Sequence, residues 1–308
     1  MEPIEAAILR TILYADVFNF PLTVAEIHHF FIHHEPVSEA EIRRTLATST
    51  RLQSCLYITD EYIARAGRED LIALRRIRCA ASRELWPLAA AYGRWLARLP
   101  FVRMVALTGA LAMHNARHRR DDLDYLLVTR PGRVWLARAF SILLVRLARL
   151  QGVEVCPNYV LAETHLEQQR RDIFIAHEVA QMVPLYGRAV YERMRERNAW
   201  VLGCLPNAGG VFHHENERPI GRFGAGFKRL LEALLGGRLG DALERWESRR
   251  KLRRFSADIH RLPHHSARLD DSQVKGHFND HGHFVLRQYT ERLREYGLES
   301  QTAATAAD

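Results

Sequence analysis

Apolar positions in the first part of the chain repeat at helical spacing and are followed by two short apolar runs. Helical spacing covers residues 4–15. Two capping-box patterns, which begin at Thr23 and at Ser38, predict two further helices because each precedes a group of spaced apolar residues. The apolar runs at residues 55–58 and 62–64 flank a polar turn and predict a β-hairpin. Three helices and a hairpin are therefore expected at the start of the chain.

The middle of the chain alternates between helical and strand patterns. In order, we expect a helix-rich segment over 66–99, strands over 101–107 and 125–128, a helix over 135–150 and a strand over 153–161. Residues 166–201 return to helical spacing with a break at 184–187, and a last helical region covers 227–255. Arginines in the 66–99 segment alternate with apolar positions, so we expect them on a solvated outer face; they are Arg75, Arg76, Arg78, Arg83, Arg94 and Arg98.

These patterns predict an α+β protein with several parts. The expected parts are an N-terminal domain over 1–68, a core with flanking helices over 69–202, a linker over 203–221, a helical C-terminal region over 222–298 and a mobile tail over 299–308.

Net charge indicates the class of partner, and the cysteines and the lack of long apolar runs indicate the compartment. The 308 residues carry a net charge of +8 with a pI of about 9.6, which favours partners that bear phosphate. The four cysteines are far apart and form no C-x-x-C pair, as is typical of a reducing compartment. No signal-like start or long apolar run is present, so we expect a cytoplasmic protein with no membrane partner.

The segment over 101–128 holds the strongest candidate chemistry. Its first apolar run stops at Gly109, where the backbone can turn sharply. Asp122 and Asp124 open the second strand, and their i, i+2 spacing places both carboxylates on the same face. Two neighbouring acids on a buried strand need a cation. An acid pair at the start of a strand is also a common surface turn, and that alternative stays open.

This combination resembles the nucleotidyltransferase superfamily typified by DNA polymerase β. The family has Gly-Gly or Gly-Ser, roughly ten residues, and then a pair of acids flanked by apolar residues. Here Gly109-Ala110 and Asp122-Leu123-Asp124 match, and the resemblance covers about residues 100 to 165. It implies a mixed-sheet core and an enzyme that moves a nucleoside monophosphate from a nucleoside triphosphate (NTP) to an unidentified acceptor. The N-terminal helices and hairpin resemble a winged helix.

The resemblance also implies roles for individual residues. Asp122 and Asp124 would be catalytic and would bind Mg²⁺, which prefers oxygen ligands. Gly109 and Ala110 would cradle the triphosphate, and Glu154 would supply the third acid. Two arginines of the basic connector, Arg119 and Arg120, would meet the triphosphate or the acceptor, although a charge-balanced surface explains them equally well.

Other assignments remain open. Ala110 stands where the family commonly has Ser, and strand alternation places Glu154 and Asn158 on one face, so the register decides which of them occupies the third-acid position. A catalytically degenerate fold that binds nucleotide or nucleic acid as a regulator is therefore the alternative. A third hypothesis is a winged-helix transcription factor that binds nucleic acid through Arg43 and Arg44 and whose middle domain only dimerises or binds an effector. Independently of these hypotheses, the basic run over 245–254 could also bind nucleic acid. Glu178, Gln181 and Asn198 are further residues that could reach the cleft.

Overall fold

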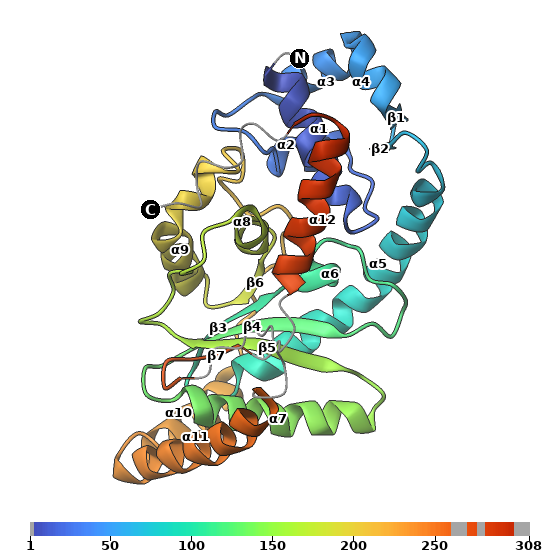
Figure 1. Cartoon of the computed structure of the whole chain (residues 1–308). Coiled ribbons are helices and arrows are strands. Elements are labelled where there is room, and N and C mark those ends of the chain that lie inside the picture. The colour runs from blue at the N-terminus through green and yellow to red at the C-terminus, as the bar shows by residue number, and fades with distance from the viewer. Residues whose placement is uncertain (1–2, 260–269, 276–280, 299–308) are drawn as a thin grey trace.

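A computed structural model describes residues 3–259, 270–275 and 281–298 (Figure 1). Within these residues the chain forms twelve α-helices, a five-stranded mixed sheet and a small hairpin. The expected α+β class and the mixed sheet are confirmed. The predicted mobile tail over 299–308 lies outside the described residues.

The N-terminal part follows the expected order of helices and hairpin. Its elements are α1 (Pro3–Asp16), α2 (Val24–His29), α3 (Glu39–Thr48), α4 (Thr50–Cys55), β1 (Leu56–Ile58) and β2 (Ile63–Arg65). At the start of α2, Thr23 Oγ1 accepts from the Glu26 amide at 3.1 Å, while Glu26 Oε2 accepts from the Thr23 amide at 2.8 Å. This reciprocal pair confirms the first capping box. Helix α4 was not expected; Ser49 caps it by accepting from the Leu52 amide.

The central sheet has the order β6-β3-β4-β5-β7. Its strands are β3 (Val102–Leu107), β4 (Leu123–Thr129), β5 (Val155–Ala162), β6 (Val183–Tyr186) and β7 (Gln273–Lys275). Strands β4 and β5 are parallel, and the other neighbours are antiparallel. The break expected at 184–187 is mostly edge strand β6, where Pro184 is tolerated because β3 is the one described strand that pairs with β6.

Helices cover both faces of this sheet (Figure 1). On one face lie the N-terminal helices with α8 (Ile173–Ala180), α9 (Arg188–Arg197) and α12 (His281–Glu295); on the other lie α5 (Asp70–Ala97), α7 (Val134–Leu150), α10 (Arg222–Leu234) and α11 (Arg238–Ile259). A single turn, α6 (Gly109–Ala112), follows β3, and a 3₁₀ helix (Ala199–Gly203) follows α9. Most of the expected linker, residues 204–221, has no regular structure.

Alternation along β4 determines which side chains reach which layer. Leu126 and Val128 pack in the cluster that contains the N-terminal helices, while Tyr125 and Leu127 pack in the opposite cluster. Asp124 therefore faces the N-terminal helices. Among the described residues, no helix combines the length and apolarity needed to cross a bilayer.

Candidate functional site

The site begins at the turn between β3 and α6. Gly109 has φ +66, a backbone conformation that side chains disfavour. A Cβ placed at Gly109 would collide with the carboxylate of Asp124. The Thr108 amide donates to the Asp124 carbonyl at 3.0 Å, so the turn is held against the start of β4. Glycine is needed here both for its backbone conformation and because the acid lies against it.

Asp124 is surrounded by polar groups from β4 and β5. The Asn158 side-chain amide donates a hydrogen bond to Asp124 Oδ1. Asp122, Asp124 and Cys156 can each bring one ligand atom within 4.8 Å of the others. Asp122 is exposed, whereas Asp124 and Cys156 are half-buried. The acid pair thus lies at the boundary between the sheet and an open cavity.

The pKa of Asp124 is raised to about 8, chiefly by burial and next by the charge of Asp122, while the hydrogen bond from Asn158 opposes the rise. Glu178 and Asp121 also repel a negative charge there. The pKa of the Cys156 thiol is raised to about 12, first by burial and then by Asp124. The carboxyl group of Asp124 therefore lies where a nearby cation would favour its ionised form.

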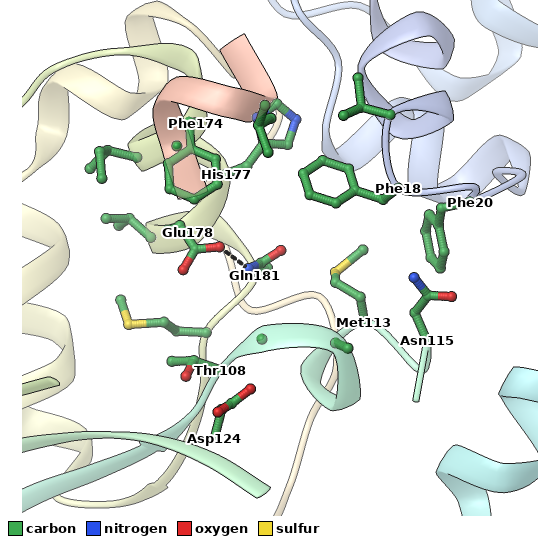
Figure 2. Close-up of a pocket in the computed structure, with 18 of the residues that line it drawn as sticks. Phe18, Phe20, Thr108, Met113, Asn115, Asp124, Phe174, His177, Glu178 and Gln181 are labelled. Atoms are coloured by element: carbon green, nitrogen blue, oxygen red, sulfur yellow. Dashed lines mark hydrogen bonds between the residues drawn. The ribbon is translucent and has the colours of Figure 1, made fainter. Parts of the chain in front are cut away.

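A cavity of about 670 Å³ opens above Asp124, between the sheet and the N-terminal helices. Figure 2 shows Thr108 and Asp124 on one side, Glu178 of α8 and Gln181 just after that helix on another, and Phe18 and Phe20 opposite them. Gln181 Nε2 donates to Glu178 Oε1 at 2.7 Å. Aromatic side chains form much of the wall; they are Tyr14, Phe18, Phe20, Phe30, Phe174 and Phe284. The cavity therefore combines an acidic floor with an aromatic wall.

Three arginines also line the cavity, and they differ from the two that the sequence suggested. They are Arg78, Arg117 and Arg170. The guanidinium of Arg78 donates to Asn115 Oδ1 at 3.2 Å, which holds it at the cavity edge. Arg119 instead pairs with Glu84 at 2.9 Å, with 74% of its side chain exposed, and neither Arg119 nor Arg120 is among the lining residues. Cationic groups are present at the cavity, but from other positions in the chain.

The residues considered for the third-acid position occupy different places in the structure. Glu154 precedes β5, and its side chain is 60% exposed with Arg149 3.6 Å away. Asn158 is the residue that reaches Asp124. Glu178 faces the same cavity from α8, whereas Asn198 is buried and holds backbone groups around Leu166. Outside the acid pair, Asp121 and Glu178 line the cavity; Asp121 accepts from the Arg117 amide beside the pair, so Glu178, on a separate helix, is the candidate for a third functional acid.

The donor set suits a hard divalent cation. Two carboxylates are ligands of the kind that Mg²⁺ takes alongside water and phosphate oxygens. Because its pKa is about 12, the Cys156 thiol is neutral near pH 7 and a poor ligand for Mg²⁺. The fit to Mg²⁺ therefore depends on Asp122 and Asp124, with Ala110 exposed at the cavity rim beside them.

Sequence reasoning missed the N-terminal contribution to this site. Phe18 and Phe20 follow α1 in an irregular segment whose spacing carries no signal for a cavity. Thr108 was also missed; a hydroxyl next to the Gly turn was the available signal. We compared the chain with known protein families, with curated proteins and with solved structures, and none of the three comparisons found a match.

Proposed function

We propose that the chain is a Mg²⁺-dependent nucleotidyltransferase, similar to the polymerase β superfamily, that transfers a nucleoside monophosphate from an NTP to an acceptor hydroxyl. One observation carries the proposal: the half-buried Asp124 lies against the Gly109 turn, beside Asp122, on the floor of a cavity of about 670 Å³. A carboxylate with a pKa raised by burial and by neighbouring acids is typical of functional sites.

In such a transfer, the acceptor oxygen forms a bond to the α-phosphorus while the bond from that phosphorus to the bridging oxygen breaks, and pyrophosphate leaves. Mg²⁺ held by Asp122 and Asp124 would neutralise phosphate charge. Arg78 and Arg117 would attract the triphosphate to the cavity. Glu178 would take the proton from the acceptor hydroxyl, since its carboxylate faces the cavity from a separate helix.

The N-terminal part supports a small acceptor rather than a nucleic-acid chain. Its aromatic residues close one wall of the cavity, and a volume of about 670 Å³ is typical of a small-molecule site. We assign these helices and the hairpin to a winged-helix-like module. The outer arginines of α3 are neutralised within the helix, because Arg43 lies 2.6 Å from Glu39 and Arg44 lies 3.7 Å from Glu41. A phosphate backbone would find little net positive charge there.

A specific observation favours a second candidate, a degenerate fold that binds nucleotide without turnover. An amide, Asn158, rather than a carboxylate, contacts Asp124. Glu154 is exposed and lies beside Arg149. If a third carboxylate is indispensable and Glu178 does not supply it, binding would persist without chemistry.

Thermal unfolding with each NTP, with and without Mg²⁺, tests both candidates. The variants are Asp124→Asn and, as a matched control, Asp60→Asn, which changes an exposed acid in the hairpin turn. Ligand at about a hundred times its dissociation constant stabilises a fold by roughly 2.7 kcal/mol. We expect a Mg²⁺-dependent rise in melting temperature that Asp124→Asn loses and Asp60→Asn keeps.

Pyrophosphate release then separates the two candidates. The native protein is incubated with NTP, Mg²⁺ and a panel of small hydroxyl compounds. Pyrophosphate release that is lost in Asp124→Asn and in Glu178→Gln supports the enzyme. Binding without release across that panel supports the degenerate fold. A melting temperature that no NTP changes, in a protein that unfolds cooperatively, would contradict both.

A further inference from the structure

Helix α10 carries a row of apolar side chains that are more than half exposed in the part of the chain that the structure describes. Phe223, Phe227, Leu230 and Leu234 recur at i, i+4, i+7 and i+11, so they share one face of the helix. They are 96%, 60%, 56% and 60% exposed, respectively. A contiguous apolar surface of this kind on a folded protein marks an interaction site.

The outward charges of α10 are all of one sign, whereas a lysine and a glutamate of this helix are engaged on its inner side. Lys228 is buried and donates to two backbone carbonyls at 2.8 and 2.6 Å. Glu232 turns inward and lies 2.9 Å from Arg103. The exposed charges of this helix are therefore arginines, Arg222 and Arg229, on either side of Phe227 in sequence.

Helix α11 likewise has its described carboxylates engaged and its exposed charges supplied by arginines. Two of its described acidic side chains contact other parts of the chain: Asp241 lies 2.7 Å from Arg133, and Glu244 accepts hydrogen bonds from backbone amides of α7. A third, Glu247, pairs with Arg250 of the same helix. The outer side is basic and surrounds a tryptophan that is 60% exposed; its residues are Arg245, Trp246, Arg249, Arg250 and Arg253. Two successive helices thus offer apolar and cationic groups to the outside, while the carboxylates of their described side chains are already engaged.

We propose that α10, with the basic outer side of α11, docks the chain on the surface of an anionic lipid bilayer. Phe and Leu side chains on one helical face, with arginines beside them, are typical of a helix that lies in the plane of the interface. The arginines complement lipid phosphates. Such a helix does not span the bilayer, which is why the absence of a long apolar run led to the opposite expectation from sequence.

Charge is the reason to choose a bilayer over a second copy of the chain. A twofold pairing of the α10 faces would bring Arg222 and Arg229 toward the same residues of the other copy. Glu232, the one carboxylate of α10, is already paired with Arg103. An anionic surface gains from these arginines, whereas a second copy would be repelled by them.

Co-sedimentation with phosphatidylcholine vesicles, with and without phosphatidylglycerol, tests this proposal on the full chain. The test variants are Phe223→Ser with Phe227→Ser, and Arg222→Gln with Arg229→Gln. The matched controls are Ile77→Ser, a residue 64% exposed on α5, and Arg51→Gln, an exposed arginine of α4. All six substitutions in these four variants are on the surface, so each variant is first shown to have the melting temperature of the native protein.

We expect the native protein and both controls to sediment with vesicles that contain phosphatidylglycerol. Each test variant should bind at least about tenfold more weakly, and added salt should release the native protein. Equal binding to vesicles without phosphatidylglycerol would overturn the anionic assignment. The absence of any vesicle binding would overturn the proposal, and a dimer in light scattering that Phe223→Ser with Phe227→Ser disrupts would then assign the face to a second copy.

Discussion

The side-chain amide of Asn158 donates a hydrogen bond to Oδ1 of Asp124, at the point where parallel strands β4 and β5 depart from regular register. The irregularity falls between Tyr125 and Leu126 on β4. It gives the carboxylate a neutral donor from the neighbouring strand. This bond lowers the pKa of Asp124 against the stronger effect of burial, but it adds no negative charge for a cation.

Asn158→Asp should strengthen metal binding while weakening the metal-free protein. A third carboxylate next to Asp124 adds like-charge repulsion, which we expect to lower the free energy of unfolding by about 1–2 kcal/mol without divalent cation. With Mg²⁺ present, Asn158→Asp should become more stable than the native protein if the cation lies between the two strands. Melting temperature across a Mg²⁺ titration measures this. Asn158→Ala, which removes the bond without adding charge, should weaken the fold by about 1 kcal/mol at every Mg²⁺ concentration. If Asn158→Asp is also weakened equally at every Mg²⁺ concentration, the cation lies elsewhere.

Asp124→Asn should stabilise the metal-free protein at neutral and higher pH. The pKa of Asp124 is raised to about 8, so the folded state holds a proton that the unfolded chain releases above about pH 4. Stability from this group is therefore present at low pH and is lost as pH rises toward 8. We expect the variant to exceed the native protein by about 1–3 kcal/mol at pH 8 and to match it near pH 4. Urea unfolding at several pH values, with Asp60→Asn as control, measures the difference. Parallel pH profiles for Asp124→Asn and native protein would contradict the raised pKa.

Gly109→Ala should weaken the fold more than the same change at another glycine with positive φ. Gly132 has φ +70, and a Cβ there would meet no atom within 4 Å, so Gly132→Ala should show backbone strain alone, about 1 kcal/mol. At Gly109 the added methyl would also displace the Asp124 carboxylate, and we expect about 2–4 kcal/mol together with loss of Mg²⁺-dependent stabilisation. Denaturant unfolding of both variants tests this. Equal effects would show that Asp124 moves aside without penalty.

Local patterns predicted the helices and strands around this site but not which residues from distant segments line the cavity. The Gly turn and the spacing of Asp122 and Asp124 depend on neighbours in sequence, so the i, i+2 rule placed the acid pair at the start of a strand. Strand register depends on a partner more than thirty residues away. Alternation alone could not choose between Glu154 and Asn158, and the irregular pairing of β4 with β5 is invisible in either strand.

Arginines illustrate a second limit of the sequence. The solvated-face interpretation is correct for Arg76, which is exposed and pairs with Glu61, but wrong for Arg75, which is buried. Arg78 instead reaches the cavity edge. Helix α5 contacts the N-terminal part as well as the sheet, and a helix between two partners buries polar positions that periodicity assigns to solvent.

The buried ion pair between Glu26 and Arg75 should dominate the attachment of the N-terminal part to α5. The two side chains lie 2.7 Å apart and are 3% and 4% exposed, and Arg75 also donates to the His114 carbonyl, close to the site, at 2.8 Å. Arg75→Met leaves the Glu26 carboxylate buried without its counterion, so we expect a loss of about 3–5 kcal/mol. Arg76→Met, the adjacent exposed pair, should change stability by less than about 1 kcal/mol.

A double variant, Glu26→Gln with Arg75→Met, should recover at least half of the loss caused by Arg75→Met alone, since glutamine can still accept from the Thr23 amide while carrying no charge. Urea unfolding of the two single variants and the double variant completes the cycle. If the double variant is no more stable than Arg75→Met, the loss comes from the packing of Arg75, whose guanidinium lies 4.0 Å from the centre of the Phe20 ring, rather than from the uncompensated charge. In either case the folded variants should bind NTP more weakly, because Phe20 is part of the cavity wall.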